Sequence, residues 1–479
     1  MLRWILGGRE AQGVVEKNSV LFSGEEQPKN CFTELQVLKG HFDIVRYLVQ
    51  IDDFRFASAG DDGLVLVWNV ETGERLLELR GHTQQITALV PYTITQEDMT
   101  HTSLITASSD RSVSLWDPDT GNRVQTVSDL QSSVKCLLVL SWHNIWLSGG
   151  NGLCVWSSGF QLLSKTEQHS DTGVTAMVEL PRNYVAAAVD REIIIYELKV
   201  SSTESDVSIT AFRHLANHQD SIRALINVSD KLFASGSHIG ELIIWDSVEW
   251  TIHADDQIAL EDLHYDGPLE IRLASQKQSD MSIQHLVSDG ELVVAAVGSG
   301  LYVYNVQKKC MVACRKLAHD SDILHTKLLS QRYDSDILHT KLLSQRYDSD
   351  ILHTKLLSQS KLMSCSEDGS VKMWELQEPL LLAEPTTAGF FGMWSFGRPN
   401  KQGPSPKRFP EAPGLKTLEL MGDLIGHSGA VQMFLNFGER GLVTCSTDHL
   451  LIVWRDGERQ SHLRGLELFQ KLEENQGLS

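Results

Sequence analysis

The chain has 479 residues, of which 42% are hydrophobic, and its net charge is −20. This composition suits a folded protein with an extensive core, and the negative charge argues against a surface that tracks nucleic-acid phosphates. There is no apolar run long enough to span a membrane, and the seven cysteines are scattered, so neither a transmembrane helix nor a disulfide framework is expected. Cys310 and Cys314 lie close together, but nothing nearby completes a zinc set, so we expect no metal and no cofactor in a cytoplasmic protein.

Residues 1–30 carry no repeat and are expected to be disordered. From there on, a unit recurs that starts at a His after a small residue and ends in Trp or Tyr. A constant separation of 27 positions joins the two residues in four units: His41 and Trp68, His169 and Tyr196, His218 and Trp245, His427 and Trp454. The unit from His82 to Trp116 is longer, and we place its extra residues in the polar stretch 96–98. With the unit that starts at His319 and two weaker ones near 128–156 and 280–304, the total is eight.

Each unit contains three short β-rich runs separated by turn residues, and a fourth run follows the Trp. Four strands of this size cannot bury both faces of their sheet alone, so the units must stack radially. The sequence therefore predicts an all-β fold, an eight-bladed WD-repeat β-propeller over residues 31–460. The strand 34–38 precedes the first His and is well placed to complete the last blade.

Four units share a His, a hydroxyl residue, an Asp and a Trp at fixed offsets. The sets are His41, Ser58, Asp62 and Trp68; His82, Thr106, Asp110 and Trp116; His319, Ser364, Asp368 and Trp374; and His427, Thr444, Asp448 and Trp454. We interpret them as structural tetrads, in which the Asp accepts from the His, the His from the hydroxyl, and the hydroxyl from the indole. A Ser–His–Asp set also suggests a hydrolase, but a catalytic triad has no reason to repeat with the fold.

The complete sets fall in blades one, two, seven and eight. Blade five has Ile239 where the Asp is expected, and blades three to six are interpreted as degenerate. We therefore expect a tightly tied half near the termini and a looser half opposite.

A 12-residue segment occurs three times with a period of 14, beginning at Asp320, Asp334 and Asp348. Two surplus copies explain why His319 and Trp374 are so far apart. The copies are identical although the blades have diverged, which indicates a recent tandem duplication or an artefact of gene prediction. This insertion within 320–359 is expected to loop out of an otherwise ordinary blade.

A long loop, 376–414, interrupts blade seven. It carries large apolar side chains and one Arg between glycines: Phe390, Phe391, Met393, Trp394, Phe396 and Arg398. Aromatic residues and Arg dominate binding hot spots, so we interpret the loop as a linear binding motif. The alternative is that it folds back and covers the side of the propeller.

Residues 461–479 are predicted to form a short amphipathic helix and a tail. Apolar residues recur every three positions at Leu463, Leu466, Phe469 and Leu472, and charged residues occupy the other faces. The pattern leaves open whether this face packs on the propeller or on a partner.

The degenerate eight-blade pattern, the aromatic loop and the helix 468–475 together resemble one family of WD-repeat propeller proteins. The resemblance implies a non-catalytic adaptor in a complex with two DENN-domain proteins, which acts in guanine nucleotide exchange, small GTPase regulation and autophagy. The Smith–Magenis-region DENN protein would be contacted directly, through terminal regions that include Leu463, Leu466, Phe469 and Leu472, and the chromosome-nine open-reading-frame protein indirectly. A cationic amino-acid transporter would bind the aromatic loop and recruit the complex to the lysosomal membrane.

Two other functions were weighed. Substrate receptors of cullin-type ubiquitin ligases often carry Trp-Asp-x-Arg at a blade end, but here Pro118-Asp119 follows Trp116-Asp117, and no Arg is in place. An enzyme would need a phosphate-cradling loop, a zinc motif or paired acids, and none is found outside the structural turns.

Overall fold

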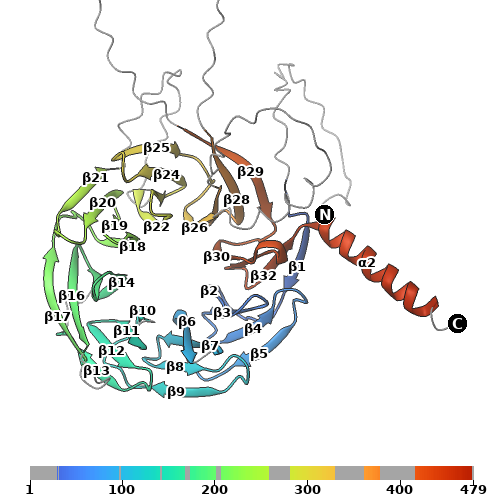
Figure 1. The fold of residues 1–479 in the computed structure, drawn as a ribbon, viewed down its shortest axis with the longest axis horizontal. Coiled ribbons are helices and arrows are strands. Elements are labelled where there is room, and N and C mark those ends of the chain that lie inside the picture. The colour runs from blue at the N-terminus through green and yellow to red at the C-terminus, as the bar shows by residue number, and fades with distance from the viewer. Residues whose placement is uncertain are drawn as a thin grey trace, which may run out of the picture.

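The computed structural model describes residues 30, 32–96, 99–140, 143–167, 173–200, 207–257, 281–329, 361–377 and 416–476. The strands form eight four-stranded antiparallel sheets, arranged as blades around a central axis (Figure 1). The eight-bladed all-β propeller predicted from the repeat is therefore confirmed.

In blades one to seven the strands follow the chain from the innermost to the outermost, and in blade eight the outermost strand comes from the N-terminal part of the chain. Blade one consists of β2 (Val45–Gln50), β3 (Arg55–Gly60), β4 (Val65–Asn69) and β5 (Arg75–Leu79), and blade two of β6 (Ile86–Gln96), β7 (Met99–Ser108), β8 (Val113–Trp116) and β9 (Arg123–Val127). Blade three consists of β10 (Cys136–Leu140), β11 (Ile145–Gly149), β12 (Leu153–Ser157) and β13 (Leu162–Lys165), and blade four of β14 (Val174–Leu180), β15 (Tyr184–Val189), β16 (Glu192–Val200) and β17 (Val207–Leu215). Blade five consists of β18 (Ile222–Ser229), β19 (Leu232–Ser237), β20 (Glu241–Asp246) and β21 (Ile252–Gln257), and blade six of β22 (Ile283–Ser288), β23 (Leu292–Val297), β24 (Gly300–Asn305) and β25 (Cys310–Arg315). Blade seven consists of β26 (Ile323–Leu329), β27 (Lys361–Ser366), β28 (Ser370–Gln377) and β29 (Thr417–Ile425), and blade eight of β30 (Val431–Asn436), β31 (Leu442–Ser446), β32 (Leu451–Arg455) and β1 (Glu34–Leu38).

The core lies between the blades. The middle strands are buried on both faces, as in β3 and β4, because each sheet is sandwiched between two neighbours. Eight apolar clusters result, and each joins one blade to the next. The apolar runs of the sequence are thus explained by radial stacking, and no blade has a core of its own.

The ring closes in blade eight. β1 pairs antiparallel with β32, so the first and last strands of the propeller share one sheet. Arg455 at the end of β32 is buried and fastens this sheet to blade one, because its guanidinium donates to the carbonyl oxygens of Val70 at 2.7 Å and Glu71 at 2.8 Å. The strand before the first His therefore completes the last blade, as the sequence predicts.

Both irregular units of the sequence fit this plan. In blade two the additional residues extend the β6–β7 hairpin, whose pairing continues to Gln96 and Met99. In blade seven the first copy of the repeated segment supplies β26, which pairs directly with β27. The surplus copies fall within residues 330–360, which lie outside the described part of the chain.

The helix α2 (Gly457–Gln476) follows blade eight without a linker and projects away from the ring (Figure 1). Asp456 caps its first turn, since its side-chain oxygen accepts from the backbone N–H groups of Glu458 and Arg459. The predicted start at residue 461 is thus too late by four residues, because Asp456 was not read as a cap. Within the described ranges, no helix combines the length and apolar character needed to cross a membrane.

Candidate protein-binding surface

The tetrad of blade one is a continuous hydrogen-bonded chain. His41 Nδ1 lies 2.8 Å from Asp62 Oδ2, and His41 Nε2 lies 2.8 Å from Ser58 Oγ. The indole N–H of Trp68 donates to the same Ser58 Oγ at 2.9 Å. Because a carboxylate only accepts, the ring is protonated on Nδ1, and the Ser hydroxyl donates to Nε2.

The other three predicted tetrads have the same connectivity. The distances from His to carboxylate, His to hydroxyl and indole to hydroxyl are 3.1, 2.7 and 2.8 Å in blade two, 3.0, 2.8 and 2.9 Å in blade seven, and 3.0, 2.7 and 2.9 Å in blade eight. The glycine before the His has a steric reason in blade eight, where a Cβ on Gly426 would lie 2.7 Å from the Trp454 ring.

Burial favours the neutral form of two of the tetrad histidines. Burial lowers the pKa of His82 and of His427, and the neighbouring carboxylate offsets this only in part. Burial raises the pKa of Asp62, but hydrogen bonds from His41 and from backbone N–H groups outweigh it, so the pKa falls below its usual value. In blades two and eight the pair is therefore a neutral imidazole bonded to a carboxylate.

The tetrads are unsuited to nucleophilic catalysis. The Ser58 hydroxyl is completely buried and already engaged by the indole of Trp68 and the ring of His41. A nucleophile must reach a substrate carbonyl, and this oxygen has no approach. The networks tie the strands of a blade to its entering loop.

Blade five corrects the prediction of a degenerate half. His218 lies 2.6 Å from Ser235 Oγ, Trp245 donates to that oxygen at 2.8 Å, and the carboxylate comes from Glu241 at 3.1 Å. The repeat predicts an Asp at the place of Ile239. Glu241 stands two residues later, and its longer side chain reaches back to the same ring nitrogen.

Blades three, four and six do depart from the tetrad. Trp156 of blade three still donates to a hydroxyl, Ser148 Oγ at 2.9 Å, but Gln131 precedes that Ser by the 17 positions that separate His41 from Ser58. In blades four and six, Tyr196 and Tyr304 replace the Trp.

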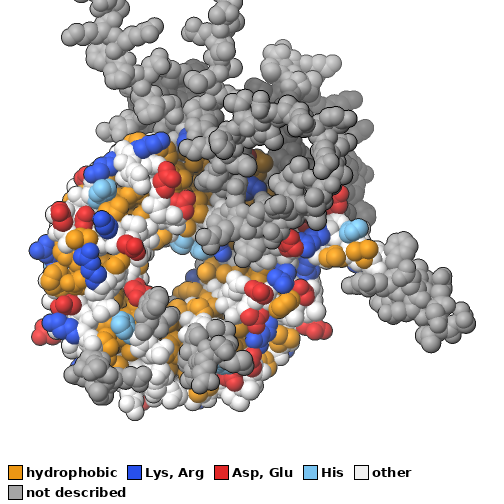
Figure 2. Space-filling model, in the orientation of Figure 1, with side chains coloured by type: hydrophobic (Ala, Val, Ile, Leu, Met, Phe, Trp, Pro, Cys, Tyr) orange, Lys and Arg blue, Asp and Glu red, His pale blue; other side chains and the backbone are white. Residues whose placement is uncertain are grey.

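An exposed apolar surface lies where the ring closes. Leu35 and Val37 of β1 are 50% and 41% exposed, and Leu463, Leu466 and Leu468 of α2 are 41%, 48% and 62% exposed. We call these five residues the closure surface. Apolar side chains are visible at the base of α2 (Figure 2).

Polar contacts hold the base of α2 beside β1. Arg464 donates to both carboxylate oxygens of Glu34, at 3.1 and 2.9 Å, and the N–H of Gly457 donates to Thr33 Oγ1 at 3.1 Å. Of the predicted helix residues, Leu463 and Leu466 are thus exposed rather than packed on the propeller. The side chains of Phe469 and Leu472 lie outside the described ones.

The aromatic loop is not placed. Phe390, Phe391, Met393, Trp394, Phe396 and Arg398 all fall in residues 378–415, outside the described part of the chain. Its binding role therefore stays a prediction.

Among the described residues, three side chains come together as metal ligands might. His101, Asp117 and Asp119 present their donor atoms within 4.8 Å of one another. The guanidinium of Arg55 already bonds Asp119 at 2.6 Å and supplies positive charge there. The group is a surface charge cluster, and no cation role follows from it.

Five His–hydroxyl–Trp networks on a closed ring of eight blades define the class of the chain as a WD-repeat β-propeller. The profile of the WDR41 β-propeller family matches residues 1–337 and 337–464. WD repeat-containing protein 41 of Homo sapiens is 52% identical over 99% of this chain and 98% of its own length, and that of Mus musculus is 51% identical over the same shares. The chain belongs to the WDR41 family.

Solved structures show the same fold at low identity. Chaetomium thermophilum Sqt1, bound to the N-terminus of the ribosomal protein L10, has a TM-score of 0.60 and 15% identity. The match covers 89% of this chain and 100% of that one. The computationally designed Ika8 protein has a TM-score of 0.57 and 19% identity over 88% of this chain and 98% of that one. These likenesses concern the fold alone.

Proposed function

We propose that the chain is a non-catalytic adaptor that joins a complex of two DENN-domain proteins, which regulates small GTPases and autophagy, and brings it to lysosomes. Membership of the WDR41 family supports an adaptor role, since a WD-repeat propeller is a rigid scaffold for partners. The DENN partners and the lysosomal transporter rest on the resemblance described above. The observation that carries the proposal is the closure surface.

The closure surface has the features of a partner site. Large apolar side chains at this exposure are common singly, but here five of them lie on the edge strand β1 and the adjoining helix α2. β1 pairs only with β32 within the described residues, so its outer side offers backbone groups to a partner. A helix that projects from the ring while exposing leucines gains its packing when a second protein covers it. We infer that the Smith–Magenis-region DENN protein is that partner.

Charged substitutions on α2 should separate binding from folding. Replacing Leu463, Leu466 and Leu468 together with Asp should lower affinity for the DENN complex at least ~100-fold, because apolar contacts are lost and charges are buried. The propeller should keep its stability, since these side chains are exposed. Co-purification and titration of the purified proteins measure the loss.

A matched control uses exposed apolar residues of other blades. Leu76 on β5 and Val124 on β9 are 42% and 55% exposed, and L76D/V124D should leave the affinity unchanged. If the α2 variant binds as tightly as the native chain, or if both variants lose the same affinity, the DENN contact lies elsewhere.

Lysosomal recruitment is assigned to the aromatic loop. A peptide spanning residues 387–398 should bind the cationic amino-acid transporter, and Trp394→Ala should abolish recruitment while the DENN complex stays assembled. Imaging of the tagged chain in cells, together with co-purification, measures both properties. Recruitment that persists in the variant refutes the loop assignment.

A further inference from the structure

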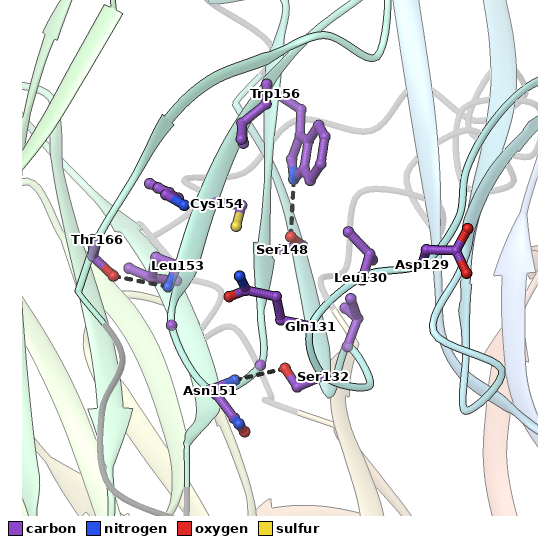
Figure 3. A pocket seen from close by; sticks show the side chains of 15 residues that line it. Asp129, Leu130, Gln131, Ser132, Ser148, Asn151, Leu153, Cys154, Trp156 and Thr166 are labelled. Atoms are coloured by element: carbon purple, nitrogen blue, oxygen red, sulfur yellow. Dashed lines mark hydrogen bonds between the residues drawn. The ribbon is translucent and has the colours of Figure 1, made fainter.

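Blade three contains a cavity of about 200 Å³ (Figure 3), and its lining includes Gln131 and Ser148, which by sequence offset correspond to the His and the hydroxyl residue of the tetrads. The loop that enters β10 forms one wall, and β11 and β12 form the other. Leu130, Leu153 and Trp156 contribute apolar surface, and Ser148 places a buried hydroxyl in the lining. We call this cavity the blade-three slot.

Two changes in sequence produce the slot. In blades one, five and eight, a buried His stands 17 positions before the hydroxyl residue, whereas Gln131 stands 17 before Ser148 and its side chain is exposed. The β11–β12 turn is also shorter, since eight positions separate Ser148 from Trp156 where ten separate Ser58 from Trp68. The carboxylate that this turn carries elsewhere is lost with it.

The remaining groups still match an imidazole. Ser148 Oγ accepts from the Trp156 indole at 2.9 Å, as the hydroxyls of the complete tetrads do. In those tetrads the hydroxyl proton goes to His Nε2, but in blade three its neighbour is the Cys154 thiol, a weak acceptor. The volume is ample for a ring, because a cavity of roughly 150 Å³ holds benzene.

We propose that the blade-three slot binds the imidazole ring of a histidine presented by a partner peptide. The ring would lie against Trp156 and accept the Ser148 hydroxyl proton, in the way that His218 accepts from Ser235 in blade five. The chain supplies this ring from its own loop in five blades, whereas in blade three the loop carries Gln131, which lines the slot. The slot is separate from the closure surface, so it offers a second protein contact.

Titration with 4-methylimidazole tests the slot. The experiment is run near pH 8.5, where an imidazole is neutral, by calorimetry and thermal shift. Saturable binding with a Kd of roughly a millimolar is expected for so small a ligand. N-acetylhistidine methylamide should bind as well, because a histidine within a peptide must fit its backbone at the entrance of the slot. If 4-methylimidazole binds and N-acetylhistidine methylamide does not, the ligand is not a peptide histidine.

Two variants locate the binding. S148A removes the hydroxyl donor of the slot and should weaken ligand binding at least ~10-fold. S235A removes the equivalent hydroxyl of blade five, where His218 already occupies the site, and should leave ligand binding unchanged. H218G opens an equivalent slot beside Ser235 and Glu241, so it should gain a second site and recover stability with the ligand. The proposal is overturned if H218G responds while the native chain does not, if S148A binds as tightly as the native chain, or if toluene competes equally well.

Discussion

Replacing His218 with Ala should destabilise blade five by about 3 kcal/mol, as much as His41→Ala destabilises blade one. The side chain of His218 is fully buried and bridges a buried hydroxyl and a carboxylate. Its removal leaves Glu241 and Ser235 without that partner, and a buried polar group left unsatisfied costs about 1–3 kcal/mol, more for a carboxylate. Amide hydrogen exchange in β19 and β20 should accelerate roughly 100-fold, since about 1.4 kcal/mol corresponds to a factor of ten.

The comparison between the two blades decides how the ring is tied. Gln219→Ala serves as a control, because it alters the residue beside His218 and keeps the backbone N–H that Glu241 accepts. If the His→Ala substitution destabilises blade one strongly and blade five little, the half of the ring opposite the termini is the looser one, as the sequence predicts. Equal effects would show that Glu241 substitutes fully for the usual Asp.

Acidification should loosen the contact between blades six, seven and eight, through a pair of histidines outside the tetrads. His285 of β22 and His325 of β26 have ring centroids 4.5 Å apart, and His325 lies edge-on to Phe434 of β30 at 4.7 Å. Thr326 donates to His285 Nδ1 from its hydroxyl at 3.0 Å and from its backbone at 3.4 Å. In the described part of the chain, His325 Nδ1 has no hydrogen-bond partner.

Both rings are held neutral. Burial lowers the pKa of His285 to about 4. Burial, together with the repulsion that a proton on His325 would meet from a protonated His285 and from Lys327, lowers the pKa of His325 well below its usual value. The unfolded chain binds protons near pH 6.5, so stability is fully present above that pH and declines as the pH falls toward the folded-state pKa. At pH 5 the loss from His285 should be about 2 kcal/mol, and His325 should add to it.

Urea unfolding at pH 7.5 and pH 5 measures this loss. The double variant His285→Leu and His325→Leu should lose less stability between the two values than the native chain. Leu324→Ala removes packing on the same strand without removing a titrating group, so it should destabilise equally at both pH values. An unchanged pH dependence in the double variant would assign acid sensitivity to the tetrads instead.

The sequence predicts the blades well because one hydroxyl must meet both a His ring and an indole. That requirement fixes the lengths of the loop and the hairpin, and so fixes the separation of His41 from Trp68. The requirement determines only where the carboxylate must lie, however, and an acid at another position of the sequence can supply that carboxylate. Glu241 was missed for this reason: a carboxylate two residues further on reaches the same nitrogen with one more methylene.

The slot of blade three could not be predicted from sequence for a related reason. Its Trp is intact, and the shortened turn is visible only once Ser148 is known to be the hydroxyl that accepts from Trp156. The start of α2 was missed because Asp456 acts as a cap while the strand before it ends at Arg455. The exposure of Leu463 and Leu466 depends on where the helix leaves the ring, which periodicity does not determine.

Hydrogen exchange of the chain, alone and bound to the purified DENN complex, tests the central claim most directly. An adaptor that binds through its closure surface should gain protection in residues 34–38 and 457–476 and little in the outer strands β5, β9 and β13. Protection confined to those outer strands, with none in β1 and α2, would contradict the account.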